Sequence, residues 1–180
     1  MKKIISFLFS LFCFTAIYAQ DYQLKIDTKE SSIKYEGDHL LHSWEGINNN
    51  IFGLAIFDAN QIDLKKIAIL CYVRDFDSNN SSRDAHSLEV LNELKYPEIK
   101  FYSNSLQKKD TIININGTFD FHGIKVKKSL SANFENLKKK YLIFGEFEII
   151  PSDFNIDLPS FLSVKMDDLL KIEYRIVLKK

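Results

Sequence analysis

The sequence has 180 residues, with 24 Lys and Arg against 24 Asp and Glu, 46% apolar residues and 13% aromatic ones. The apolar fraction is that of a globular chain and excludes a disordered or collagen-like one. The length predicts one domain. The balanced charge predicts neither a nucleic-acid-binding surface nor a polybasic patch for an anionic membrane.

Residues 1–19 are typical of a secretory signal peptide. Lys2 and Lys3 precede an apolar run over 4–17, and Ala19 offers a small residue for cleavage. The run is shorter than the about 20 apolar residues of a membrane-spanning helix. We therefore expect an exported protein, periplasmic or secreted.

The mature domain is then residues 20–180, and no second apolar stretch long enough to cross a membrane follows in it. Cleavage would leave Cys71 as the single cysteine, so no internal disulfide can form. Cys71 lies in an apolar run, which favours a buried, unreactive thiol.

Most of the mature chain alternates apolar and polar residues with period two, the pattern of strands with one buried face. In 112–121, for example, Ile113, Ile115, Phe119 and Phe121 share one face. About nine strands are predicted, at 22–27, 32–38, 52–58, 66–74, 99–104, 112–121, 129–135, 141–150 and 170–178. Such a series predicts an all-β antiparallel sandwich or barrel.

One stretch follows a different period. Between the fourth and fifth strands, apolar residues recur every three positions, at Ala85, Leu88, Leu91 and Leu94. This predicts one short amphipathic helix at about 83–94, with Ser82 as its N-cap. The helix is either a lid over exposed core at one end of a barrel or a gate to an internal cavity.

The sequence contains few candidates for catalysis. We find no nucleophile elbow, phosphate-binding loop or HExxH pattern, so no catalytic residue, metal site or cofactor is predicted. His39 and His42 are three residues apart, and on a continuous strand they would face opposite sides. A metal-assisted enzyme that uses His86 and His122 stays open as an alternative.

An eight-stranded barrel has an interior that is either filled by side chains or wide enough for one small ligand. The apolar strand faces and the aromatic content favour a carrier for a hydrophobic molecule, although alternation does not say which face points inward. A filled core, and with it a structural or partner-binding module, is the main alternative. The candidate lining residues are Phe101, Ile113, Ile115, Phe119, Phe121, Ile172, Tyr174 and Ile176.

Several motifs together resemble one family. Residues 82–101 are similar to the Arg-Asp-x-His-Leu … Tyr-Pro-x-x-x-Phe signature of the YceI-like family. Residues 115–124 resemble its Gly-x-Leu-Thr-x-His-Gly-Val segment, and 152–156 its Ser-Asp-Phe-Gly-Ile, with Asn155 in place of the glycine. Similar stretches at 31–35, 42–46 and 168–178 complete the family order.

The resemblance implies an extended, lipocalin-like antiparallel barrel of eight strands. It also implies an elongated pore for a polyisoprenoid or isoprenoid-quinone-like lipid, and a protein that is not an enzyme. Some members are dimeric, so a homodimer belongs to these expectations. Trp44 either lines the pore or plugs one end, His122 is expected to form a hydrogen bond in its own turn, and the bulky Phe119 and Phe121 would narrow the pore.

Overall fold

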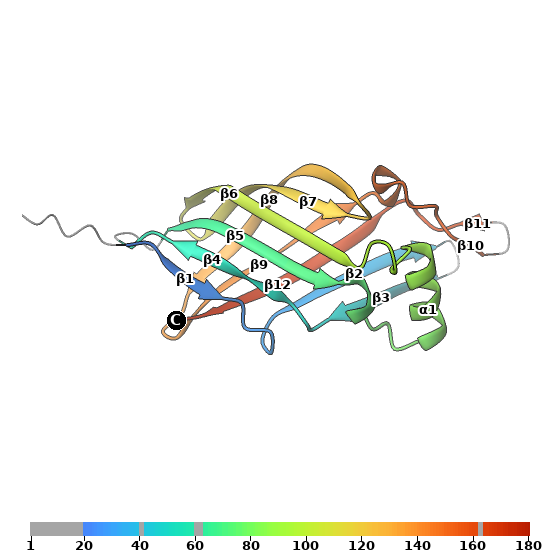
Figure 1. The fold of residues 1–180 in the computed structure, drawn as a ribbon, viewed down its shortest axis with the longest axis horizontal. Coiled ribbons are helices and arrows are strands. Elements are labelled where there is room, and N and C mark those ends of the chain that lie inside the picture. Colours follow the sequence, from blue (N-terminus) through green and yellow to red (C-terminus); the bar gives the residue numbers. More distant parts are fainter. Residues whose placement is uncertain (1–19, 40–41, 60–62, 162–163) are drawn as a thin grey trace, which may run out of the picture.

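The computed structural model describes residues 20–39, 42–59, 63–161 and 164–180, so the predicted signal peptide lies outside the described residues. The chain is almost entirely β-structure (Figure 1). The strands are β1 (Tyr22–Lys25), β2 (Ser32–His39), β3 (His42–Asn48), β4 (Phe52–Phe57), β5 (Leu64–Tyr72), β6 (Glu98–Lys109), β7 (Ile112–Phe121), β8 (Ile124–Asn136), β9 (Lys140–Ile149), β10 (Ser160–Phe161), β11 (Val164–Lys165) and β12 (Leu170–Lys179). The helices are α1 (Ser81–Val90) and the short 3₁₀ turns η1 (Val73–Asp75) and η2 (Pro151–Phe154).

Ten of these strands form one curled antiparallel sheet, a half-barrel, in the order β1-β4-β5-β6-β7-β8-β9-β12-β2-β3. The all-β antiparallel fold is therefore confirmed, whereas the expected number of eight strands is wrong. The sequence pattern missed β3, because its buried positions are held by Gly46 and Asn48 instead of large apolar residues. β10 and β11 form a separate two-stranded sheet.

The period-two pattern does set the buried face of the long strands. In β7 the predicted apolar row Ile113, Ile115, Phe119 and Phe121 is buried, and Ile112 and the asparagines between them are exposed. The pattern breaks at the end of β12, where Ile176, Val177 and Leu178 are all fully buried. Here the pairing of β12 with β2 has ended at Arg175, and the chain after β1 takes its place beside β12 through a bridge between Ile26 and Leu178.

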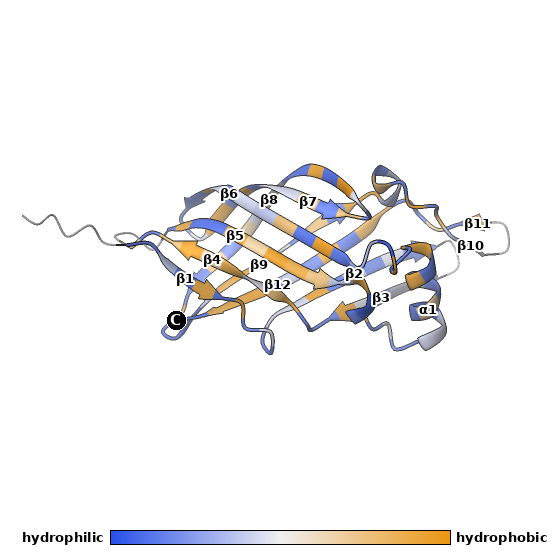
Figure 2. Cartoon of the chain, in the orientation of Figure 1, coloured by the Kyte–Doolittle hydropathy of each residue, from blue (hydrophilic) through white to orange (hydrophobic). Residues whose placement is uncertain are grey.

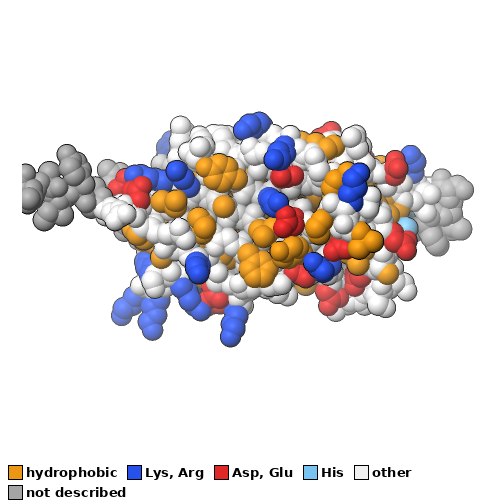
Figure 3. Space-filling view, in the orientation of Figure 1, with side chains coloured by type: hydrophobic (Ala, Val, Ile, Leu, Met, Phe, Trp, Pro, Cys, Tyr) orange, Lys and Arg blue, Asp and Glu red, His pale blue; other side chains and the backbone are white. Residues whose placement is uncertain are grey.

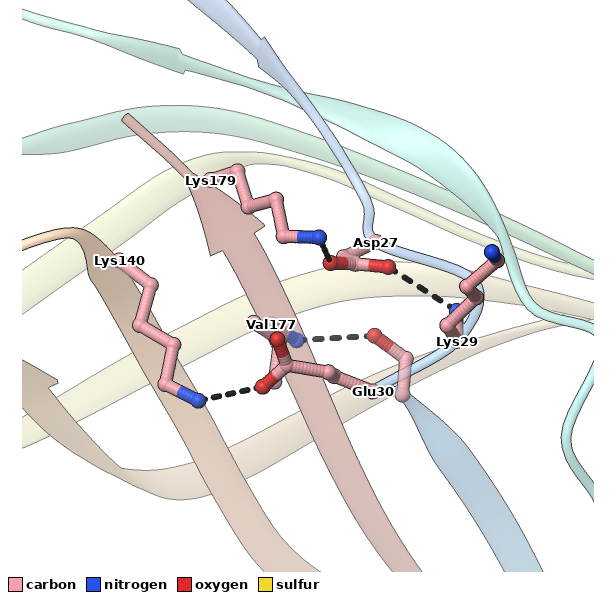
Figure 4. A network of polar contacts seen from close by, with 7 residues as sticks. Asp27, Lys29, Glu30, Lys140, Val177 and Lys179 are labelled. Carbon is pink, nitrogen blue, oxygen red and sulfur yellow. Dashed lines mark hydrogen bonds and ion pairs between the residues drawn. The ribbon is translucent and has the colours of Figure 1, made fainter.

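A polar network fastens the loop between β1 and β2 to this end of β12 (Figure 4). The Asp27 amide donates to the Val177 carbonyl at 2.8 Å, and the Val177 amide donates to the Ser31 hydroxyl at 2.9 Å. Two ion pairs, Asp27–Lys179 and Glu30–Lys140, surround these bonds. Lys179 holds the pKa of Asp27 below its usual value. The network thus joins segments that lie at opposite ends of the sequence.

The helix α1 begins two residues earlier than predicted. Its N-cap is Asn80, whose side chain accepts hydrogen bonds from the Ser82 and Arg83 amides at 3.1 Å, so the expectation of Ser82 as cap is wrong. The predicted end at about 94 is also wrong: the helix ends at Val90, and a turn follows over residues 91–95. Figure 1 shows α1 at the same end of the molecule as β10 and β11, opposite β1 and the C-terminus.

Candidate functional site

The interior of the curled sheet is divided into a packed end and an open end. The packed end lies beside β1, where Figure 2 shows hydrophobic stretches of β1, β4 and β5 close together. Four rings stack here in a row: Tyr22 on Phe57 (5.5 Å), Phe57 on Tyr141 (4.7 Å) and Tyr141 on Phe134 (5.5 Å). The Tyr22 and Tyr141 hydroxyls lie 3.1 Å apart, within hydrogen-bond distance. Phe57, Phe134 and Tyr141 are almost fully buried, so this aromatic row fills the interior at this end.

The other half contains a cavity of about 400 Å³. Pockets for small-molecule ligands are commonly about 300–1,000 Å³ and mostly apolar. The walls come from β2, β3, β5, β6, β7, β8, β9 and β12, and α1 covers the open end. Its size and apolar walls suit a hydrophobic chain.

Eight of the nine residues predicted to line a pore lie on this wall: Trp44, Phe101, Ile115, Phe119, Phe121, Ile172, Tyr174 and Ile176. Contact of these residues with a ligand stays a prediction. Ile113 has the same inward orientation but lies outside the cavity lining, in the hydrophobic core. The row along β7 thus passes from cavity wall to packed core between Ile115 and Ile113, a boundary that alternation does not reveal.

The inward faces of neighbouring strands add cavity residues that the sequence did not single out. Tyr35 of β2 and Phe147 of β9 are the cross-strand partners of Ile172 on either side of β12, and both line the cavity. Directly paired residues of antiparallel strands point to the same face. Strand pairing, once known, would therefore have identified them.

Two glycines let aromatic rings lie close against the wall instead of filling the cavity. A Cβ at Gly46 would meet the Tyr35 ring at 2.4 Å, and one at Gly145 would meet the Tyr174 hydroxyl at 2.8 Å. Larger side chains at these positions would push the rings away from the sheet. The cavity therefore stays open although tyrosines line it.

Polar groups reach the cavity at its covered end, from α1. Arg83, Asp84 and His86 contribute to the lining there. The Asp84 carboxylate accepts a hydrogen bond from the Ser78 hydroxyl at 2.6 Å, which fixes the first turn of the helix. Burial raises the pKa of the Tyr35 hydroxyl, and Asp84 adds to this shift. α1 thus covers a cavity, which fits both a fixed lid and a gate. That the helix moves as a gate stays a prediction.

The histidines are placed differently from the sequence expectation. His39 and His42 are cross-strand partners in the β2–β3 hairpin, with ring centroids 5.8 Å apart, and both line the cavity. The expectation that they face opposite sides is wrong, because the chain reverses between them. His122 lies in the β7–β8 turn as expected, but its hydrogen-bond partner lies outside that turn, because its Nδ1 is 2.9 Å from the carbonyl oxygen of Phe154 in η2. Among the described residues, no group of three or more metal-ligating side chains comes together.

Cys71 is buried in the wall at 2% exposure, and burial raises its pKa to about 12. The prediction of a buried thiol is confirmed.

Within the part of the chain that the structure describes, no helix has the length and apolar character needed to cross a membrane.

Comparison with known proteins agrees with this architecture. Residues 24–178 match the family model described as the YceI-like domain. A Protein YceI from Salmonella agona is 26% identical over 136 residues, which cover 73% of this chain and 71% of the relative.

Solved structures with the same fold include Burkholderia cenocepacia BcnA, with a TM-score of 0.76, 15% identity, and coverage of 84% of this chain and 98% of BcnA. A polyisoprenoid binding domain from Saccharophagus degradans has a TM-score of 0.72 at 10% identity, with 87% of this chain and 97% of that one covered. The YCEI protein of Campylobacter jejuni has a TM-score of 0.67 at 19% identity, with coverage of 79% and 89%. Because the family model matches residues 24–178, most of the 180-residue chain, this chain belongs to the YceI-like family.

Proposed function

We propose that this protein is an exported, non-catalytic carrier that holds an apolar chain lipid, a polyisoprenoid or an isoprenoid-quinone-like molecule, in its cavity. The observation that carries the proposal is the apolar cavity of about 400 Å³ under α1. The name of the Saccharophagus degradans domain, a polyisoprenoid binding domain, supports the same ligand class. Export is supported by the signal-peptide pattern of residues 1–19.

Hydrophobic burial alone can hold such a chain. Each buried methylene contributes roughly 0.8 kcal/mol, so several isoprene units placed along this wall would bind without any specific polar contact. The rings of Phe119, Phe121 and Phe154 form a cluster of edge-to-face and tilted contacts, with centroids 5.3 to 6.0 Å apart, beside which such a chain would lie. A filled-core module, the main alternative, is disfavoured by the cavity itself.

Native mass spectrometry of the purified mature protein, followed by solvent extraction, tests the proposal. We expect a discrete added mass that extracts as an isoprenoid lipid, or uptake of added polyprenyl lipid by a stripped sample. Phe121→Glu would place a carboxylate on the cavity wall and abolish uptake. Asn114→Glu, at an exposed position of the same strand, is the matched control and should leave uptake unchanged. A sample that stays free of lipid after incubation with polyprenyl lipids would refute the carrier function.

A further inference from the structure

The wall of the curled sheet has a seam between β8 and β9. β8 pairs with β7 from Ile124 to Asn133, and β9 pairs with β12 over its whole length. β8 and β9, however, pair with each other only through Asn133–Asn136 and Tyr141–Phe144. Residues 124–132 of β8 and 145–149 of β9 therefore form no backbone pairs with each other, and we call this region the β8–β9 seam.

Lys128 lies on the β8 side of this seam and points inward. Its cross-strand partner on β7 is Gly117, and its neighbours in the same row, Val126 and Leu130, are paired with Phe119 and Ile115 of the cavity wall. Because paired residues share a face, Lys128 belongs to the inward row. It is the one charged residue in that row of β8, which is otherwise Ile124, Val126, Leu130, Ala132 and Phe134.

The Lys128 ammonium group lies across the seam. It donates a hydrogen bond to the Glu148 carbonyl oxygen on β9 and lies 5.7 Å from the centre of the Phe147 ring. Within the described residues it forms no ion pair with a carboxylate. The Phe147 ring also lines the cavity. Lys128 itself lies outside the cavity lining and its hydrogen bond is exposed to solvent, so a positive charge with a neutral acceptor lies at the seam next to one residue of the cavity wall.

A second polar group at the seam lacks a partner. The Tyr174 hydroxyl is buried, and among the described residues nothing forms a hydrogen bond with it. A Cβ built at Gly145, the first residue of β9 beyond the β8–β9 ladder, would lie 2.8 Å from this hydroxyl and 3.1 Å from the Ser131 carbonyl oxygen of β8. Burial raises the pKa of Tyr174 to about 12, so the hydroxyl remains a neutral donor. A buried hydroxyl without a partner carries a desolvation cost that a ligand acceptor would remove.

We infer that the β8–β9 seam is a head-group site for an amphiphile whose apolar chain lies in the cavity and whose head is an anion, a phosphate or a carboxylate. Lys128 exchanges its bond to the Glu148 carbonyl for a bond to the anion, and the Tyr174 hydroxyl supplies a second donor. This inference rests on the proposed function, because it places the head of a ligand whose tail occupies the cavity. Charge-assisted hydrogen bonds are about twice as strong as neutral ones, so this exchange favours binding.

The test compares two ligands that share one chain, geranylgeranyl phosphate and geranylgeraniol, by isothermal titration calorimetry on the stripped mature protein. The wild type should bind the phosphate about tenfold more tightly, the effect of one hydrogen bond to a charged group. Lys128→Met keeps an apolar stem over Phe147 and should abolish this preference, whereas Lys128→Arg should retain it. Added salt should reduce the preference as well.

Lys127→Met is the matched control. Lys127 is the adjacent residue, faces outward and hydrogen-bonds to Thr118, so its replacement makes the same change in net charge and should leave the preference intact. Inorganic phosphate alone is expected to show no binding that depends on Lys128. Binding of free phosphate as tight as that of the amphiphile would instead indicate an anion site without a role for the chain.

The inference is overturned if Lys128→Met retains the preference for the phosphate, or if Lys127→Met removes it to the same extent. Equal binding of the phosphate and the alcohol by the wild type also refutes the head-group site but leaves the carrier function standing. Binding of neither ligand by the wild type refutes the carrier function and the head-group site together.

Discussion

Two isoleucines on β7 allow a direct test of the boundary between packed core and cavity. Ile113 and Ile115 are two residues apart, point to the same face and are buried to 1% and 3% exposure. Only Ile115 lines the cavity. The substitutions Ile113→Ala and Ile115→Ala therefore remove the same atoms from the same strand, and differ in what surrounds the removed atoms.

The packed site should lose more stability. Removal of three carbons costs about 2.4 kcal/mol in transfer free energy, at roughly 0.8 kcal/mol each. At Ile113 the change also opens a new void of on the order of 80 Å³, which adds about 2 kcal/mol if the neighbours do not relax. At Ile115 the freed space joins an existing cavity, so only the transfer cost is expected. The free energy of unfolding should thus fall by about 4 kcal/mol for Ile113→Ala and about 2 kcal/mol for Ile115→Ala.

Urea denaturation of the stripped protein, followed by the fluorescence of Trp44, the single tryptophan, measures both values. A difference of about 2 kcal/mol should separate the two midpoints by about 1 M urea. If about half of the transfer loss, about 1.2 kcal/mol, reflects contacts that face the ligand, lipid affinity should fall roughly eightfold for Ile115→Ala and stay unchanged for Ile113→Ala. Equal losses of stability, or a loss of affinity for Ile113→Ala as large as that for Ile115→Ala, would refute the boundary.

Two further predictions concern titratable groups. The pKa of Asp27 is lowered mainly by Lys179, so this carboxylate stabilises the fold above its usual pKa, and the stabilisation should be lost as the pH falls below about 4. Asp27→Asn should flatten the acid limb of the stability curve in thermal melts, and an unchanged limb would contradict the assignment. The Cys71 thiol, with its raised pKa and burial, should resist alkylation at pH 8 and react after denaturation in urea; rapid labelling of the folded protein would show that the wall opens.

Much of the fold was predictable from local patterns. Period-two alternation depends only on which side chains avoid water, and it located the buried rows of strands such as β7. The helix was visible because its apolar residues recur with a different period, although its N-cap was placed two residues late. β3 escaped prediction because Gly46 and Asn48 occupy its buried positions, and no apolar signal marks them.

The sequence by itself determined the chain's all-β class, its one short helix, the buried state of Cys71 and the family to which it is similar. Only the tertiary structure decided that Ile113 is core while Ile115 is cavity wall, that His39 and His42 are neighbours, and that Lys128 points into the seam. The reason is that alternation specifies the two faces of each strand separately. Which faces enclose a cavity, and where packing fills it, depend on strand pairing between residues far apart in the chain.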